Sequence, residues 1–233
     1  MDTEDCGYED LRDCLRDLAS VNRVTLGYRP TLGFLARMTR EGRMPIGRLV
    51  HIVDVGSGYG DTLRAIHRWA NRRGIEVQLT GIDLNPWSIR AAREASLDYP
   101  KITWIERDMF ELDEVLGDRP DIIVSALFTH HLDGDGPLRF VRWMEDTARC
   151  GWFVNDLLRH PVSYWGFAAL ARLFRWHRFV QHDGPLSIAR AFRRSDWHSI
   201  VAATEILESK ARLESWFPFR LCVSRVKTDV IPN

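Results

Sequence analysis

The sequence lacks the features of disulfide-stabilised, zinc-binding and membrane-spanning proteins. Its four cysteines are scattered without a Cys-X-X-Cys pair, which indicates neither a disulfide framework nor a zinc site. No apolar run approaches the roughly 20 residues that a membrane span needs, and the acidic, polar N-terminus is unlike a secretory signal. We therefore expect a cytoplasmic protein that has no transmembrane segment and no bound metal.

The sequence also lacks a net charge. Its 32 basic and 32 acidic residues cancel, so no overall field attracts nucleic acid, and we expect no such partner. The charges are nevertheless unevenly placed. Residues 1–20 hold seven acids against two arginines, and residues 158–194 hold seven arginines against one aspartate. These segments are either solvated faces or, for the basic one, the rim of a substrate entrance.

Internal repeats are missing as well; instead, short apolar runs alternate with amphipathic stretches. The pattern predicts strands over residues 49–54, 76–82, 102–106, 121–127 and 151–155, and helices over residues 61–72, 86–95 and 136–147. Such an alternation is typical of an α/β fold, in which helices cover both faces of a parallel sheet. Right-handed crossovers place the carboxyl ends of these strands at one edge, where ligands bind.

Three segments depart from this alternation. Residues 1–44 are predicted to form an N-terminal helical lid ahead of a main domain over residues 45–233. Residues 158–194 are predicted to form an inserted helical cap followed by a loop at Gly184 and Pro185, and Ser195 is placed to cap a further helix. Residues 207–216 and 219–223 read as an antiparallel hairpin. The prediction is a Rossmann-like, doubly wound, mostly parallel sheet of seven strands.

The main functional signal is the glycine-rich segment 54–61, Asp-Val-Gly-Ser-Gly-Tyr-Gly-Asp, between a predicted strand and a predicted helix. Glycines let the backbone turn sharply and approach a ligand, and the following helix offers free N–H groups to an anion. The dinucleotide fingerprint requires glycine or alanine where this chain has Asp61. Together with Asp54, this acid favours a ligand with a cationic centre and an ammonium group, and disfavours a nicotinamide oxidoreductase.

Two further acids follow the second and third predicted strands. Asp83 is placed to accept hydrogen bonds from both hydroxyls of a ribose. Asp108 is placed to accept from an adenine amino group, with Met109 and Phe110 beside it to sandwich the ring. Asn85 either belongs to this site or caps the next helix.

These markers, in this order, resemble those of the class I S-adenosylmethionine-dependent methyltransferases over residues 45–157. The resemblance implies a Rossmann-like fold, S-adenosylmethionine as the cofactor and methyl transfer as the activity. It implies that the cofactor is bound by Asp54, Gly56, Ser57, Gly58, Asp83, Leu84, Asn85, Asp108, Met109, Phe110, Ser125 and Ala126.

The residues after the fourth and fifth predicted strands are candidates for the chemistry. Nucleobase methyltransferases of this family carry Asn/Asp-Pro-Pro-aromatic where this chain has Ser-Ala-Leu-Phe over residues 125–128, which argues against nucleobase methylation. His130 and His131 follow, and an imidazole is the natural base near pH 7. We favour His131 slightly, although either ring could merely pack in the loop. Asp156 is placed to orient a histidine or to anchor a substrate hydroxyl.

Aromatic residues of the predicted cap indicate a planar, apolar substrate, since concave ligand sites are mostly apolar. The candidate substrate contacts are Phe128, Asn155, Arg159, Tyr164, Trp165 and His182. The same segment could instead belong to the core, to a dimer interface or to a peripheral membrane contact, because arginines flank its apolar residues. Both a monomer and a homodimer fit.

We therefore expect O-methylation of a small aromatic hydroxyl compound of the phenol, quinone or polyketide type, as in secondary metabolism. Methylation of a quinone or polyketide carbon is one alternative. A non-catalytic module that holds the cofactor is another.

Overall fold

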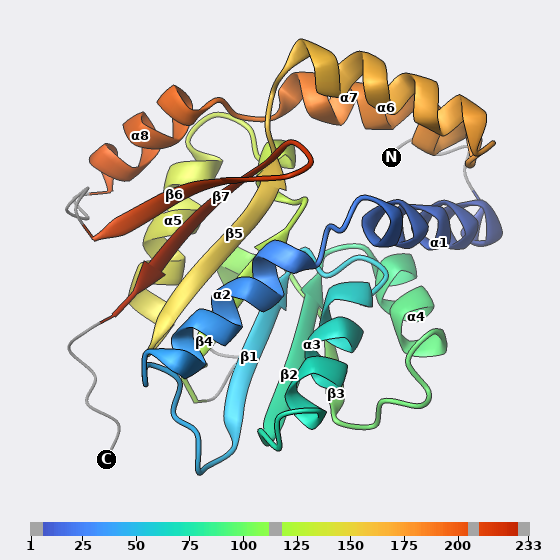
Figure 1. Cartoon of the computed structure of the whole chain (residues 1–233). Coiled ribbons are helices and arrows are strands. Elements are labelled where there is room, and N and C mark those ends of the chain that lie inside the picture. Colours follow the sequence, from blue (N-terminus) through green and yellow to red (C-terminus); the bar gives the residue numbers. More distant parts are fainter. Residues whose placement is uncertain (1–6, 112–117, 205–209, 228–233) are drawn as a thin grey trace.

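A mixed sheet in the order β3-β2-β1-β4-β5-β7-β6 forms the centre of the structure, a computed structural model that describes residues 7–111, 118–204 and 210–227 (Figure 1). The strands are β1 (Val50–Val55), β2 (Val77–Asp83), β3 (Ile102–Glu106), β4 (Ile122–Ala126), β5 (Gly151–Leu157), β6 (Ala211–Trp216) and β7 (Arg220–Val226). β1 to β5 run parallel, and β7 pairs antiparallel with both β5 and β6. The predicted seven-stranded Rossmann-like sheet is thus confirmed.

Eight α-helices and two short 3-10 helices surround the sheet in the described ranges. They are α1 (Tyr8–Val24), α2 (Arg29–Arg40), α3 (Asp61–Asn71), α4 (Pro86–Glu94), η1 (Met109–Glu111), η2 (Thr129–His131), α5 (Gly136–Thr147), α6 (Pro161–Leu173), α7 (Arg178–Arg190) and α8 (Arg194–Ala203). The periodicity of the apolar residues therefore located the parallel strands and α3 to α5 to within two residues.

The predicted loop at Gly184 and Pro185 is wrong, because both residues lie inside α7. The glycine serves helix packing, since a Cβ atom on Gly184 would overlap the Phe167 ring of α6.

The predicted C-terminal hairpin is confirmed by β6 and β7, which pair antiparallel, and Leu221 and Val223 lie in the same core. β7 starts after Phe219 and is buried on both faces, because Cys222 packs into one core and Leu221 into the other. Residues 207–209 of the predicted hairpin lie outside the described residues.

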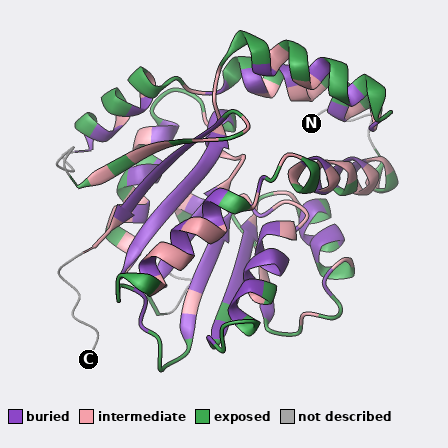
Figure 2. Cartoon of the chain, in the orientation of Figure 1, coloured by how far each residue is buried: buried purple, intermediate pink, exposed green. Residues whose placement is uncertain are grey.

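Helices cover both faces of the sheet, and the inner strands are almost wholly buried, whereas the edge strands β3 and β6 are partly exposed (Figure 2). On one face α2 and α3 pack against β1, and the rings of Phe34 and Phe153 stack with centroids 4.8 Å apart. On the other face α5 and α8 contribute Phe140 and Trp197 to a second core. α2 is therefore part of the core layer, although it belongs to the N-terminal segment.

Three helices lie around the carboxyl edge of the parallel strands: α1, α6 and α7 (Figure 1). α6 and α7 pack side by side, and a small core containing Cys14, Ala171 and Val180 joins them to α1. None of the helices in the described ranges combines the length and apolarity that crossing a bilayer requires.

The position of α2 in the core can be tested by truncating Phe34 to alanine. Phe34 is 1% exposed, so we expect Phe34→Ala to lower the free energy of unfolding by about 3–5 kcal/mol, measured by urea denaturation. Leu97→Ala is the control, since Leu97 is 84% exposed, and it should change stability by less than about 0.5 kcal/mol. Equal, small effects would contradict a core role for α2.

Candidate functional site

Asp54, the second-last residue of β1, has a carboxylate that is fully buried and has no hydrogen-bond partner among the described residues. Burial raises its pKa well above the usual range, and the nearby charges of Asp61 and Asp83 add to the shift. The Ser57 hydroxyl is likewise buried without a partner. Unsatisfied buried polar groups are costly, so this pair indicates that a ligand completes the site.

The loop after β1 approaches its neighbours so closely that only glycine fits at two positions. Gly56 and Gly60 have φ values of 70° and 71°, a region that L-residues rarely adopt. A Cβ atom on Gly56 would overlap Phe128, and one on Gly60 would overlap Trp104. Gly60 is also the N-cap residue of α3, so the loop leads directly into a helix N-terminus that is open to an anionic group.

Asp83 closes β2 next to this loop. Its carboxylate accepts hydrogen bonds from the backbone N–H groups of Gly58, at 2.8 Å, and Asn85, at 2.9 Å. Burial raises its pKa, and these two hydrogen bonds only partly oppose the shift. Asn85 caps α4 by accepting from the N–H of Trp87 at 2.9 Å, while Leu84 exposes its apolar side chain beside the site.

The segment after β3 forms a short capped turn. Asp108 accepts from the N–H of Phe110 at 3.0 Å and so holds η1 in place. Met109 is buried in the second core. The guanidinium of Arg139 lies 4.1 Å from the Phe110 ring centroid, so Arg139 covers one side of the ring that was predicted to face adenine.

The strand ends of β4 and β1 are tied together at Ser125, whose hydroxyl donates to the Val55 carbonyl at 2.8 Å. Leu127 follows with a φ of 57°, a strained conformation for such a residue. Its N–H donates to the Asn155 carbonyl at 3.0 Å. This turn places the Phe128 side chain against Gly56, so the loop after β4 contacts the loop after β1.

His130 and Asp156 form a buried pair at the ends of β4 and β5. Asp156 accepts from His130 Nδ1 at 2.7 Å, from the His130 N–H at 3.0 Å and from the Thr129 hydroxyl. Complete burial would raise the pKa of Asp156, but the attraction of His130 and these hydrogen bonds outweigh burial and hold that pKa below its usual range. Asp156 therefore stays ionised and fixes the orientation of the imidazole.

His131 lies beside this pair, with its ring centroid 4.2 Å from that of His130. Desolvation, and then repulsion from His130, lower its pKa to about 4. Its ring nevertheless reaches the surface, so solvent screens part of this effect. The direction still makes His131 a weak base that is neutral at pH 7.

A hydrogen-bond network lies on the N-terminal side of the site, and no motif in the sequence predicts it. Asp61 accepts from Asn22 Nδ2 at 3.1 Å and from the Tyr28 hydroxyl at 2.8 Å. Asn22 accepts in turn from Arg220 at 3.1 Å, and burial lowers the pKa of that guanidinium against the opposing attraction of Asp156. Asp61 thus fastens the α1–α2 turn to α3 through its hydrogen bonds to Asn22 and Tyr28.

Asn155 also serves this anchoring. Its amide donates to the Gly27 carbonyl at 2.8 Å and to the Thr31 hydroxyl at 3.2 Å, so its side chain faces the N-terminal segment. Arg159 pairs with Asp196 at 2.8 Å and lines a cavity of about 390 Å³ formed with the ends of α7 and α8. The structure does not bring these two side chains together with His130.

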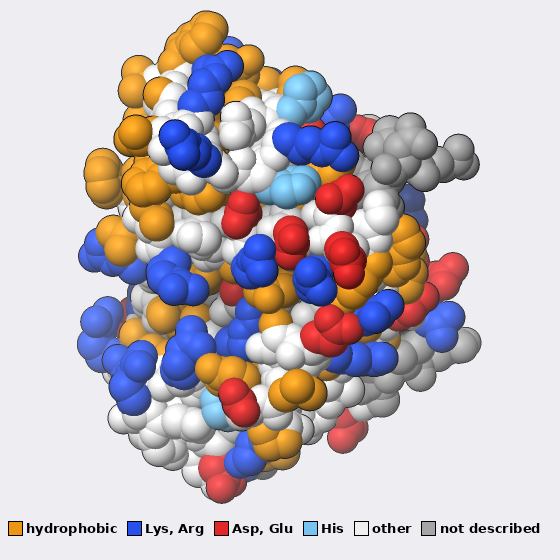
Figure 3. Space-filling view, turned by 90° about the vertical axis from the view of Figure 1, so that its right-hand side faces the viewer, with side chains coloured by type: hydrophobic (Ala, Val, Ile, Leu, Met, Phe, Trp, Pro, Cys, Tyr) orange, Lys and Arg blue, Asp and Glu red, His pale blue; other side chains and the backbone are white. Residues whose placement is uncertain are grey.

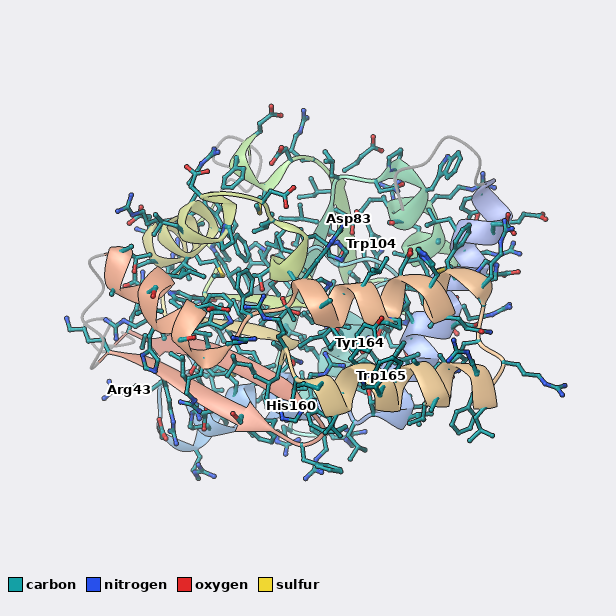
Figure 4. All side chains as sticks on the ribbon, turned by 90° about the horizontal axis from the view of Figure 1, so that it is seen from above. Arg43, Asp83, Trp104, His160, Tyr164 and Trp165 are labelled. Carbon is teal, nitrogen blue, oxygen red and sulfur yellow. The ribbon has the colours of Figure 1, made fainter. Side chains whose placement is uncertain are left out.

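The remaining predicted substrate contacts lie on the cap. Figure 4, a view from above, shows Tyr164 and Trp165 on α6, on the other side of α7 from Asp83. Tyr164 is half-buried, whereas Trp165 is 71% exposed. His182 is exposed on α7 and pairs with Asp183 at 2.9 Å.

The residues around the β1 loop fit S-adenosylmethionine. The buried Asp54 oxygens have no hydrogen-bond partner among the described residues, which suits an ammonium group, and the start of α3 has no side-chain cap, which leaves N–H groups suited to a carboxylate. The site contains three neighbouring acids, Asp54, Asp61 and Asp83. They make its electrostatic potential negative, which favours a cationic ligand. A pyrophosphate would meet the same charges as repulsion.

Comparison with known proteins agrees with this geometry. Residues 52–151 match the family model described as "Methyltransferase domain". This stretch contains the glycine loop and runs to the first residue of β5. No curated protein matches the sequence.

Several solved structures share the fold. The plantazolicin methyltransferase BpumL, in complex with SAH, has a TM-score of 0.63 at 14% identity, over 94% of this chain and 95% of that one. Magnesium protoporphyrin IX methyltransferase from Synechocystis PCC 6803 scores 0.55 at 15% identity, over 87% and 84%. The CMeT domain of the citrinin polyketide synthase scores 0.63 at 14% identity, with 85% of this chain covering 52% of that one. At these identities the likeness shows the fold.

Asp54→Asn tests the unpaired carboxylate. We expect S-adenosylmethionine to bind at least about thirtyfold more weakly, since losing one partner of a buried charge pair costs roughly 2 kcal/mol or more, as measured by calorimetry. Asp98→Asn, an exposed position, should leave the affinity unchanged.

The same variant should be more stable than the wild type without ligand. Because the folded-state pKa of Asp54 is raised, the native state holds a proton that the unfolded chain has lost. The stability of the wild type therefore falls as the pH rises above about 4, and Asp54→Asn should remove that slope in thermal melts. If Asp54→Asn leaves the dependence of stability on pH unchanged, the pKa of Asp54 is not raised by burial.

Proposed function

We propose that this chain, a class I S-adenosylmethionine-dependent methyltransferase, methylates a hydroxyl oxygen of a small aromatic compound, with His130 as the general base and Asp156 as its partner. The observation that supports this most is the buried His130–Asp156 hydrogen bond at the end of β4. It holds an imidazole in a fixed orientation at the edge where class I enzymes bind their ligands.

S-adenosylmethionine supplies an electrophilic methyl group when it is bound. On this chain, Asp54 and the start of α3 would hold its amino-acid end, Asp83 its ribose, and Leu84 and Met109 its adenine. Asp83 is preorganised for this role, because Gly58 and Asn85 fix its carboxylate. The protein then contributes position and electrostatics, and alignment alone can be worth about 7–11 kcal/mol.

The base must take a proton from a phenol, whose pKa of about 10 leaves it protonated at neutral pH. Asp156 accepts from Nδ1 of His130, which directs Nε2 to act as the proton acceptor. The ionised Asp156 also stabilises the positive charge that His130 would gain. His131 is the weaker candidate because its pKa is lowered, so the geometry moves our preference from His131 to His130.

The proposed substrate is a phenol, a quinone or an aromatic polyketide. Phe128 at the wall of the loop and the half-buried Tyr164 on α6 are the aromatic contacts that support it. Trp165 and His182 are weaker candidates, because both are exposed. Carbon methylation is the second candidate, since the same dyad suits a carbon acid and the fold is shared with a CMeT domain and with the CurJ carbon methyltransferase.

His130→Asn separates a basic role of His130 from a structural one. The asparagine amide can still donate to Asp156, but Nε2 is lost. We expect kcat to fall about 10²–10⁴-fold with unchanged cofactor affinity, and added imidazole to restore part of the rate in His130→Ala. His131→Ala should lose less than tenfold. Full activity in the double alanine variant would sink the base assignment.

The position of the new methyl group decides between the two candidate reactions. Turnover of a phenol, quinone and polyketide panel with methyl-¹³C-labelled cofactor should give a product whose methyl carbon is bonded to oxygen by NMR. A carbon-bonded methyl would replace the first candidate with the second. Tight cofactor binding without any turnover across the panel would contradict both.

A further inference from the structure

α6 carries an apolar stripe on the side that no other described part of the chain covers. Its outward residues recur at helical spacing and so lie along one face of the helix. The exposed members are Val162, Trp165, Gly166, Ala169, Leu170 and Leu173. Residues 161–171 contain no charged side chain. We call this stripe the outer α6 surface, and Leu173 at its end is 76% exposed.

The inner side of α6 already accounts for its place in the fold. Ser163, Ala168 and Ala171 are buried, and the Phe167 ring packs against Gly184 of α7 and lies 5.9 Å from the ring of Trp176. The outer α6 surface is thus not needed to hold α6 on the protein. A helix that is apolar on both sides is expected to have a second apolar neighbour.

Positive charge surrounds the C-terminal end of this surface. Arg172 and Arg175 are exposed and form no ion pair within the described part of the chain, and Arg178 only approaches Asp10 of α1, at 3.7 Å. Asp183 is the single acid of residues 158–194. Figure 3 shows hydrophobic side chains gathered over this upper part of the molecule with arginine or lysine side chains among them.

This combination favours an anionic, apolar partner over a second copy of the chain. In a two-fold dimer each patch meets itself, and this patch offers its arginines little acidic complement, because Asp183 is the single acid of residues 158–194. An anionic membrane surface offers apolar depth and negative charge together. Trp165, in the middle of the stripe, is a residue type enriched at membrane interfaces.

We propose that the outer α6 surface binds the surface of an anionic lipid bilayer, with the α6 stripe in the headgroup region and Arg172 and Arg175 against lipid phosphates. This contact holds the cap at the membrane, where apolar aromatic compounds partition. It concerns binding alone, so it stands or falls independently of the reaction that the protein catalyses.

Vesicle co-sedimentation tests the proposal with the full chain. Wild-type protein should pellet with phosphatidylglycerol–phosphatidylcholine vesicles and much less with pure phosphatidylcholine. Trp165→Glu/Leu173→Glu should weaken this binding at least about a hundredfold, since each buried apolar side chain adds roughly a factor of ten or more. Leu97→Glu is the control, because it places one such charge on an exposed leucine away from α6, and it should bind like the wild type.

The charge contribution has its own pair of variants. Arg172→Ala/Arg175→Ala should lose about thirtyfold, or about fivefold for each arginine. Arg43→Ala, remote from α6 (Figure 4), should lose nothing. Circular dichroism and cofactor affinity, unchanged in all variants, show that folding is intact.

Three results would overturn the proposal. The first is a wild-type protein that binds neither kind of vesicle. The second is equal binding of the Trp165→Glu/Leu173→Glu and Leu97→Glu variants. The third is a wild-type dimer by light scattering that Trp165→Glu/Leu173→Glu converts to a monomer, because the outer α6 surface would then be the interface between two copies.

Discussion

The alternation of side chains along β5 is the constraint on which both halves of the site depend. Neighbouring residues of a strand point to opposite faces, so Asn155 and Asp156 leave the sheet in opposite directions. Asn155 fixes the N-terminal turn through Gly27 and Thr31, and Asp156 fixes η2 through His130. A slip of one residue in the β5–β7 register would exchange these two anchors.

Those parts of the protein that depend on local sequence could be predicted. Apolar runs and helical spacing located the parallel strands and α3 to α5, because burial imposes a period on each. Asp83 and the 54–61 loop follow directly from strand ends, which a parallel sheet brings to one edge. The ambiguity at Asn85 was also local, and the structure shows the capping hydrogen bonds.

The parts that could not be predicted depend on contacts between distant segments. Nothing near Asn22 or Arg220 in the sequence indicates that they meet, since 198 positions separate them. Asp61 was interpreted by its charge alone, whereas its hydrogen bonds go to Asn22 and Tyr28. Gly184 and Pro185 are turn signals in the local sequence and so predicted a loop. They lie in a helix, where Phe167 of another helix packs against Gly184, and the local sequence does not indicate that contact.

The buried carboxylate of Asp54 couples the stability of the fold to the binding of its ligand. A cation that binds only the native state shifts the folding equilibrium by mass action, and here it also allows Asp54 to ionise beside Asp61 and Asp83. Protein without cofactor therefore spends more time unfolded and is more available to proteases. We therefore expect the lifetime of the chain in a cell to follow the supply of the cofactor, so that abundance and activity rise and fall together.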